Sequence, residues 1–434
     1  MVRTVGMVDY SRCKPAPVAS ALSLAHALSV SELPPPPPSA PASAGKSKRV
    51  EKAARLKNED VEQFVEDIFG ESLHAKRVLA LASGVLGVTH AASLAVSAIG
   101  RGLAEAKGLI PKHAIKQVDR LLSNKALDLD ELLPLWVSFV IAERKELLVT
   151  LDWTDFDADG QTTLCLNLAT THGRATPLMW KTVPKRQLKD HRNEFEDALL
   201  ERFHDLLPLG VKVTLLADRA FGDEKLYRLL QDYGFDFVIR FRGVIHVELD
   251  NDGGTFPASA LVPGNGTAKL YRNAKVTAKK TPVAGVVCVK KRGMKDAWHL
   301  ATSLGDISAS ELVKFYARRF TTEENFRDTK DTRFGLGLSA AHFNSPVRRD
   351  RALLLAAMTE ALLTLLGAAA EQAGLDRYLK SNTSKKRQHS LFNQGMYWYG
   401  AIPAMRDAWI EPLMVAFSNL LAAHPNMTQL LSVI

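Results

Sequence analysis

The sequence is poor in cysteine and has no long apolar run. Its three cysteines, Cys13, Cys165 and Cys288, lie far apart, with no CxxC pair and no histidine cluster beside them. This pattern argues against a zinc site and against a disulfide framework, and it suits a reducing cytosol. No uninterrupted apolar run reaches 18 residues, so we expect no membrane-spanning helix and no membrane partner.

A secretory signal is also poorly supported. Residues 17–30 follow three basic residues and end near Ala-His-Ala, which imitates a signal peptide, but Ser and His interrupt the apolar stretch. We therefore predict a cytoplasmic protein.

The composition is that of a globular protein with an excess of positive charge. Of 434 residues, 46% are hydrophobic and 24% charged, and the length predicts two or three domains. The formal net charge of +9 favours a polyanionic partner, although a basic enzyme that ignores DNA carries the same excess. Basic runs at 348–351 and 385–387 add charge directed at phosphate.

The pattern along the chain divides it into five parts. Residues 31–49, rich in Pro, Ser and Ala, cannot build a core and predict an extended linker. We expect an extension and linker over 1–50, a helical N-terminal DNA-binding domain over 55–146, a catalytic core over 147–242 and 306–345, a β-rich insertion over 243–305, and a helical C-terminal region over 346–434. The apolar stretch 352–370 fits either a dimer contact or an internal core.

The order of elements predicts an α/β fold with an RNase H-like mixed sheet. Three β-rich segments between 147 and 183 form an antiparallel meander, and a helix, a strand, a helix and a strand follow up to 242. One long helix is expected over 308–332.

A basic stripe marks one helix of the N-terminal domain. Lys112, Lys116 and Arg120 recur every four residues, so they share one side of the helix. A helix laid against a phosphate backbone needs this arrangement. A solvated basic face has the same spacing.

Two aspartates end strands that are otherwise apolar. Asp152 closes LLVTLD and Asp218 closes VTLLAD. A buried carboxylate without compensation is costly, and two on neighbouring strands would form a divalent cation site. Taken singly, each is also explained as a turn residue, a helix cap or, for Asp218, a partner of Arg219.

Four polar residues share one stripe of the helix expected over 308–332. Tyr316, Arg319, Glu323 and Lys330 stand at offsets that project within roughly 60° of one another. Glu324 points about 100° away, so Glu323 is the candidate ligand. An ion pair between Arg319 and Glu323 at i,i+4 is the alternative.

The spacing Tyr-x2-Arg-x3-Glu-x6-Lys resembles the signature of the insertion-sequence-four type of DDE transposases, relatives of the Tn-five enzyme. LDWT resembles the first Asp motif of that family and LLADRAFGD the second, and the resemblance covers about 147–345. The Pro-rich N-terminal extension departs from the family pattern.

The resemblance implies a cut-and-paste transposase that cleaves transposon ends and transfers strands into target DNA. It implies two Mg²⁺, replaceable by Mn²⁺, with Asp152 shared and Asp218 and Glu323 completing one site each. Tyr316, Arg319 and Lys330 would hold the DNA end. The implied partners are double-stranded DNA, as terminal inverted repeats and target, and a second copy of the chain, in a bacterial cytoplasm at the nucleoid.

Trp298 matches the place where such transposases stack a flipped base while the DNA end closes into a hairpin, although a core tryptophan fits equally. Two other functions stay open. A structure-specific nuclease would cut without joining, and a catalytically silent descendant would bind DNA without cutting. The three intact carboxylates argue against the second of these.

Overall fold

The computed structural model describes residues 58–249 and 254–423. The extension and linker predicted over 1–50, the signal-like segment 17–30 and Cys13 lie outside the described residues. Cys165 and Cys288 are free and buried.

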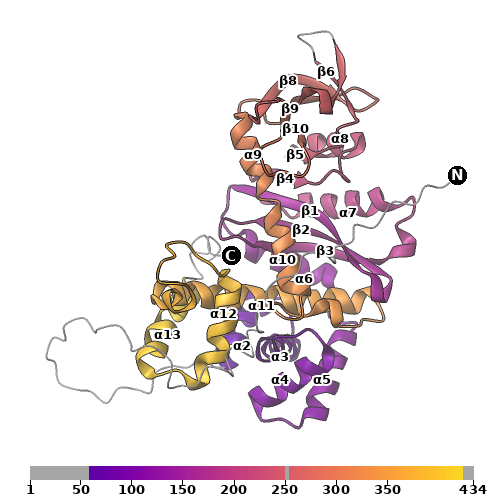
Figure 1. Cartoon of the computed structure of the whole chain (residues 1–434). Coiled ribbons are helices and arrows are strands. Elements are labelled where there is room, and N and C mark those ends of the chain that lie inside the picture. The colour runs from indigo at the N-terminus through magenta and orange to yellow at the C-terminus, as the bar shows by residue number, and fades with distance from the viewer. Residues whose placement is uncertain (1–57, 250–253, 424–434) are drawn as a thin grey trace.

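The N-terminal part is helical, as the periodicity of 55–146 predicts. Its helices are α2 (Asn58–Phe69), α3 (Ala75–Ala91), α4 (Val96–Lys107), α5 (Pro111–Ser123) and α6 (Leu129–Ile141). In α2 the apolar residues Val61, Phe64, Val65 and Ile68 are buried, because the spacing 0, 3, 4, 7 places them on one face. Figure 1 shows these helices below the sheet. The DNA-binding role of this domain stays a prediction.

Within the described residues the strands form one ten-stranded sheet in the order β3-β2-β1-β4-β5-β10-β9-β8-β6-β7. The strands are β1 (Glu146–Phe156), β2 (Gln161–Ala169), β3 (Ala175–Pro184), β4 (Lys212–Ala217), β5 (Asp236–Arg240), β6 (His246–Leu249), β7 (Thr255–Pro257), β8 (Lys269–Val276), β9 (Thr281–Val289) and β10 (Trp298–Thr302). Strands β1 to β3 form the predicted antiparallel meander, and β4 pairs with β1 in parallel. This mixed α/β sheet, with α7 (Arg192–Asp205) and α8 (Glu224–Asp232), is compatible with an RNase H-like core.

The β-rich segment 243–305 is not a separate sheet. Strand β10 pairs antiparallel with β5, and β9, β8, β6 and β7 continue the same sheet beyond it. These five strands, β6 to β10, are called the sheet extension here. Edge strand β5 would otherwise present unpaired backbone groups, and β10 supplies their partners. Figure 1 shows the resulting sheet reaching from β3 near the centre to β6 and β8 at the top.

The helix expected over 308–332 is broken. It divides into α9 (Ala309–Ala317) and α10 (Phe320–Lys330), with Arg318 and Arg319 at the junction. Helix α9 contacts β5 and β9, whereas α10 contacts β1, β2 and β3. Together α9 and α10 run across the sheet from β9 to the meander of β1 to β3, as Figure 1 shows.

The apolar stretch 352–370 lies inside the protein. It belongs to α11 (Pro346–Gln372), which contacts β3, α3, α12 (Leu391–Ala401) and α13 (Asp407–Ala422). By length and composition α11 could cross a membrane, but 94% of its most apolar window is buried among these elements. Of the two interpretations of this stretch, the internal core is the one found.

Two arginines of the 348–351 run do not face solvent. The guanidinium of Arg349 pairs with Asp159 and lies 3.8 Å from the ring centroid of Phe156. Arg351 donates to the carbonyl oxygens of Leu122 and Leu127, at 2.9 Å each. The expectation that these two bind phosphate is wrong, because both are buried where they tie α11 to the sheet and to the N-terminal helices.

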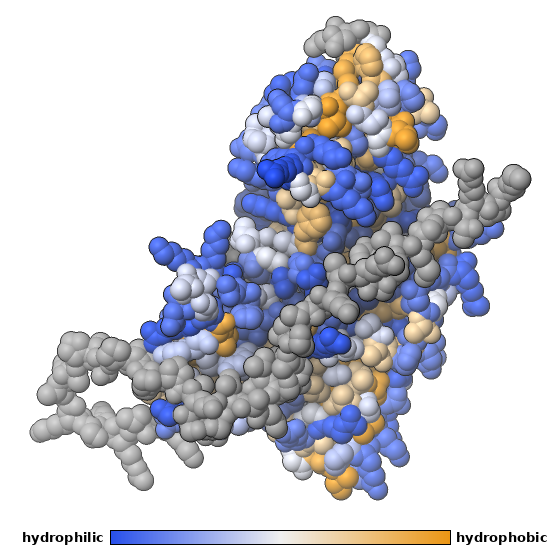
Figure 2. Space-filling view, viewed as in Figure 1, coloured by the Kyte–Doolittle hydropathy of each residue, from blue (hydrophilic) through white to orange (hydrophobic). Residues whose placement is uncertain are grey.

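The surface drawn in Figure 2 is mostly hydrophilic. Hydrophobic residues appear there in small groups over the sheet extension and the lower helices. Scattered exposed apolar side chains of this kind are normal for a folded protein.

Candidate active site

Asp152 and Asp218 lie side by side at one edge of the sheet. The parallel register pairs Leu151 with Ala217, so the next residue of each strand is an aspartate on the same face. Asp218 comes directly after β4, whereas β1 continues past this point and pairs only with β2. Asp152 therefore lies at the point where the pairing of β1 with β4 stops.

The three predicted acids influence one another electrostatically. Burial raises the pKa of Asp152 to about 6, Arg319 opposes this rise, and the negative charges of Asp218 and Glu323 add to it. The side chain of Asp152 is 18% exposed and that of Glu323 47%. Strand β1, the end of β4 and helix α10 thus bring a concentration of negative charge to one place.

Arg319 joins two of these acids. Its Nη1 donates to Asp152 Oδ2 at 3.1 Å, and its Nη2 donates to Glu323. The i,i+4 ion pair considered as an alternative is therefore present, together with a second pair that spacing alone did not predict. Arg319 stands at the junction of α9 and α10, next to the end of α10 that faces β1.

Asp218 has a local partner as well. Its Oδ1 accepts a hydrogen bond from the backbone N–H of Ala220 at 2.7 Å. Asp218 is therefore also a turn residue, which was one of the alternatives to a metal ligand. This bond leaves Oδ2 available to another ligand.

The donor set fits a hard divalent cation. Carboxylate oxygens are the ligands that Mg²⁺ and Mn²⁺ take, and excess negative charge around Asp152 favours a cation. As the side chains lie, no three His, Cys, Asp or Glu residues in the described part of the chain are gathered closely enough to hold a metal ion. A positive charge is present at this place, the guanidinium of Arg319, which binds both Asp152 and Glu323.

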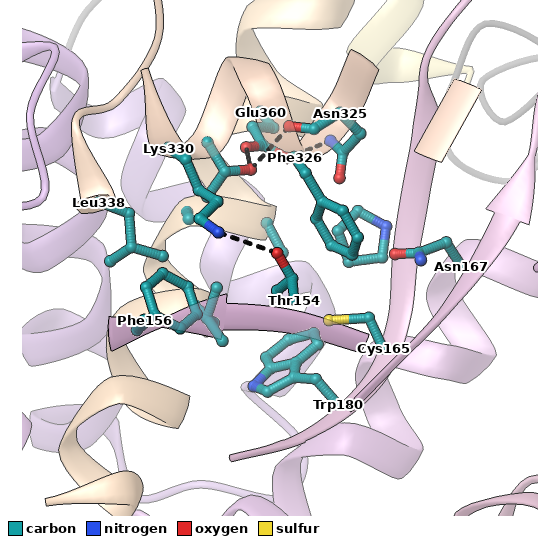
Figure 3. Close-up of a pocket in the computed structure, with 15 residues that line it drawn as sticks. Thr154, Phe156, Cys165, Asn167, Trp180, Asn325, Phe326, Lys330, Leu338 and Glu360 are labelled. Carbon is teal, nitrogen blue, oxygen red and sulfur yellow. Dashed lines mark hydrogen bonds between the residues drawn. The ribbon is translucent and has the colours of Figure 1, made fainter. Parts of the chain in front are cut away.

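Tyr316 and Lys330 lie on either side of this centre. Tyr316 is 1% exposed, in a small apolar cluster between α9 and the sheet extension, and burial raises its pKa. Lys330 Nζ donates to Thr154 Oγ1 at 3.0 Å and to the carbonyl oxygen of Asp155 at 2.7 Å, and burial lowers its pKa. Figure 3 shows the bond from Lys330 to Thr154.

Trp298 packs against the α9–α10 junction. Its ring meets Tyr316 edge to face, with centroids 4.9 Å apart, and stacks on Phe320 at 6.0 Å. This packing supports the core interpretation. Phe320 is 43% exposed and Trp298 is half-buried, so one side of the aromatic pair meets solvent. The stacking of a DNA base on Trp298 stays a prediction.

The basic stripe of α5 lies away from the carboxylates. Lys112, Lys116 and Arg120 are exposed on the side of α5 opposite its buried residues, and α5 contacts α3, α4 and α11. The structure therefore gives them a solvent-facing position in the N-terminal helices, and their contact with DNA stays a prediction.

A buried polar cluster between α10 and α11 was not predicted from the sequence. Glu360 of α11 accepts hydrogen bonds from Asn325 Nδ2 at 2.9 Å and from Thr329 Oγ1 at 2.6 Å. Beside them lies a cavity of about 20 Å³, drawn in Figure 3, which is too small for a substrate. A lone acid in the apolar run AAMTEALL, together with Asn325 and Thr329 at i,i+4, was the signal that could have revealed this cluster.

A second contact also fixes α10. The hydroxyls of Thr150 in β1 and Thr322 in α10 lie 2.5 Å apart and are fully buried. Glu323, the next residue, is thereby placed beside the strand that carries Asp152.

Comparison with known families gives one result for this region. Residues 145–359 match the family described as "Transposase DDE domain". The match begins just before β1, runs through α10 and ends within α11, so it includes Asp152, Asp218 and Glu323. No curated protein matches the chain.

Proposed function

From the transposase DDE domain at residues 145–359, we propose that the chain is a cut-and-paste DNA transposase of the insertion-sequence-four type. It would cleave at the terminal inverted repeats of its element and transfer the freed ends into target DNA. We further propose that two copies of the chain hold the two ends together.

One observation carries the proposal. Asp152 and Asp218 follow paired positions of two parallel strands, and α10 brings Glu323 to the same place, where Arg319 binds both Asp152 and Glu323. We propose that these three carboxylates hold two Mg²⁺ or Mn²⁺, which would polarise the scissile phosphate, activate the nucleophile and stabilise the leaving 3′ oxygen.

The other residues of the signature would bind and orient the DNA. Arg319 offers a planar fork suited to phosphate, and Lys330 offers a point charge close to the strand end. A phosphate that attracts Arg319 would also release Asp152 and Glu323 from their shared partner. DNA binding and metal binding would therefore assist each other.

Trp298 supports a hairpin intermediate as a further part of the proposal. A half-buried indole beside an exposed Phe320 gives a flipped base an aromatic surface, and stacking contributes about 1–3 kcal/mol per base. In a Mg²⁺ cleavage assay we expect hairpin ends from the parent and fewer from Trp298→Ala. Recovery of linear ends alone from the parent would reject the hairpin.

The function is tested with the purified chain and the ends of its own element, with and without Mg²⁺. We expect cleaved ends and joined products only with the metal, and we expect Asp152→Asn to bind the ends without cutting them. Cutting without joining would instead identify a nuclease. Binding without cutting by the parent would identify a silent descendant, and an Asp152→Asn variant that cuts like the parent would overturn the site.

A further inference from the structure

A loop of the sheet extension carries four positive charges in six residues. It joins β9 to β10 over residues 290–297 and is called the basic loop here. Its cations are Lys290, Lys291, Arg292 and Lys295, and all four are exposed. Such a run can be a solvated surface, so its position in the fold decides what it can bind.

The strand register places the basic loop at the same edge of the sheet as the carboxylates. Strand β5 runs parallel to β4 and ends at Arg240, level with Asp218. Strand β10 is antiparallel and pairs Leu300 with Arg240, so it begins at this edge with Trp298. The basic loop therefore opens onto the edge where Asp152 and Asp218 lie.

The charges of the basic loop are not neutralised by the protein. Across residues 58–249 and 254–423, no ion pair involves any of its four cations. Its one acid, Asp296, faces Arg240 at 4.0 Å. The neighbouring turn between β8 and β9 differs, because Lys279 and Lys280 there pair with Glu224 and Glu248.

The backbone of the basic loop is held in place. Met294 N donates to the carbonyl oxygen of Lys291 at 3.1 Å, and Arg240 Nη2 donates to the carbonyl oxygen of Ala297 at 3.3 Å. Beyond the loop, Trp298 and the exposed Phe320 continue the surface toward Arg319. Along this edge of the sheet the basic loop comes first, the aromatic rings of Trp298 and Phe320 follow, and the candidate active site at Arg319 lies beyond them.

We propose that the basic loop binds backbone phosphates of the duplex that enters the active site, on the side of the sheet extension. The inference rests on the proposed function and names a DNA contact outside the Tyr316, Arg319, Glu323, Lys330 signature. Each phosphate contact releases condensed counterions and adds about 0.9 to the slope of log K against log salt. The loop should therefore contribute affinity that does not depend on sequence and is lost at high salt.

The test compares two double variants that remove equal charge. Lys290→Gln with Lys291→Gln alters the basic loop. Lys145→Gln with Lys212→Gln alters two exposed residues where β1 and β4 begin, at the opposite edge of the sheet. The probe is a fluorescent duplex without terminal repeats, and its binding to the full chain is measured by anisotropy at several salt concentrations.

We expect the loop variant to reduce the salt slope by about 2, and the control to leave it within about half a unit of the parent. Circular dichroism should show both variants folded, since all four side chains are exposed. Equal reductions in the two variants would mean that net charge alone acts, and an unchanged slope in the loop variant would mean that the loop does not touch DNA. Either result overturns this inference while leaving the proposed function standing. A parent chain that binds no duplex at any salt concentration would overturn both.

Discussion

At the scale of single residues, Arg319 controls the charge of the candidate active site. It is 8% exposed and its guanidinium binds Asp152 and Glu323 together. A metal ion that takes both carboxylates has to compete with this contact. We therefore expect Arg319 to weaken metal binding in the absence of DNA.

The first prediction concerns Mn²⁺ binding without DNA. We expect Arg319→Ala to bind Mn²⁺ about tenfold more tightly than the parent, which corresponds to about 1.4 kcal/mol. Electron paramagnetic resonance of free Mn²⁺ measures the affinity. Arg327→Ala is the control, since Arg327 lies on the same helix and pairs with Glu324 at the surface. Weaker Mn²⁺ binding in Arg319→Ala would show that the arginine supports the metal site.

Sequence reasoning could place some of these residues but not all of their contacts. Asp152 and Asp218 could be paired because each closes an apolar strand, and strands in this order lie next to each other. The contact between Arg319 and Asp152 could not be predicted. It joins two elements 167 residues apart in the sequence, and helical spacing describes only neighbours within one helix.

At the scale of elements, α10 has two polar faces. One carries Glu323 and Lys330 toward the strand ends, and the other carries Asn325 and Thr329 toward Glu360 in α11. Because buried polar groups need partners, this cluster fixes how α10 sits on α11. The position of Glu323 therefore depends on a carboxyl group far from it in sequence.

The second prediction follows from the pKa of Glu360, which burial raises to about 7 from 4.5. A raised pKa means that the protonated form stabilises the fold, so this contribution is present at pH 4.5 and is lost as pH rises to 7. Glu360→Gln keeps the shape and stays neutral. Relative to the parent, it should gain up to about 3 kcal/mol in free energy of unfolding between pH 5 and pH 8.

Urea denaturation at pH 5 and pH 8 measures this difference. Glu371→Gln is the control on the same helix, where Arg387 and Gln394 hold the pKa of the carboxyl below its usual range. That variant should not gain stability at pH 8. A contrary result would be that Glu360→Gln loses more stability relative to the parent at pH 8 than at pH 5. The charged form of Glu360 would then be the one that stabilises the fold.

The third prediction compares two glycines of α12. A Cβ at Gly395 would lie 1.8 Å from the carbonyl oxygen of Leu363 in α11, whereas a Cβ at Gly400 would meet nothing within 4 Å. We expect Gly395→Ala to lower the free energy of unfolding by about 1–3 kcal/mol, because backbone atoms must move apart. Gly400→Ala should raise it by about 0.5–1 kcal/mol. Equal thermal shifts in the two variants would contradict this close packing of α11 and α12.

Periodicity also left one element ambiguous. A helix that is apolar all round, as in 352–370, is buried either in its own protein or against a second copy. The two possibilities are distinguished by what surrounds α11, which is α3, α12, α13 and β3. Contacts between residues so far apart in sequence leave no local sequence pattern. The pairing of β10 with β5 could not be predicted either, since it depends on backbone groups at the strand edges and not on side-chain type.

In the whole molecule, one continuous sheet joins the strands of the candidate active site to the sheet extension of β6 to β10. The β-rich character of 243–305 could be predicted from its residues, but its continuity with the core sheet could not. The basic loop and the carboxylates thus share one sheet edge, although Lys290 comes 72 positions after Asp218 in the sequence. A duplex at this edge would meet both.

We propose that Asp152, Asp218 and Glu323 converge on a divalent metal, and iron-directed cleavage can test this. Fe²⁺ bound in place of Mg²⁺ generates hydroxyl radicals that cut the backbone beside it. With ascorbate and peroxide, the full chain bound to duplex should break near residues 152, 218 and 323, and excess Mg²⁺ should suppress all three cuts together. Cuts at one of these positions alone, or only elsewhere in the chain, would contradict a shared metal site.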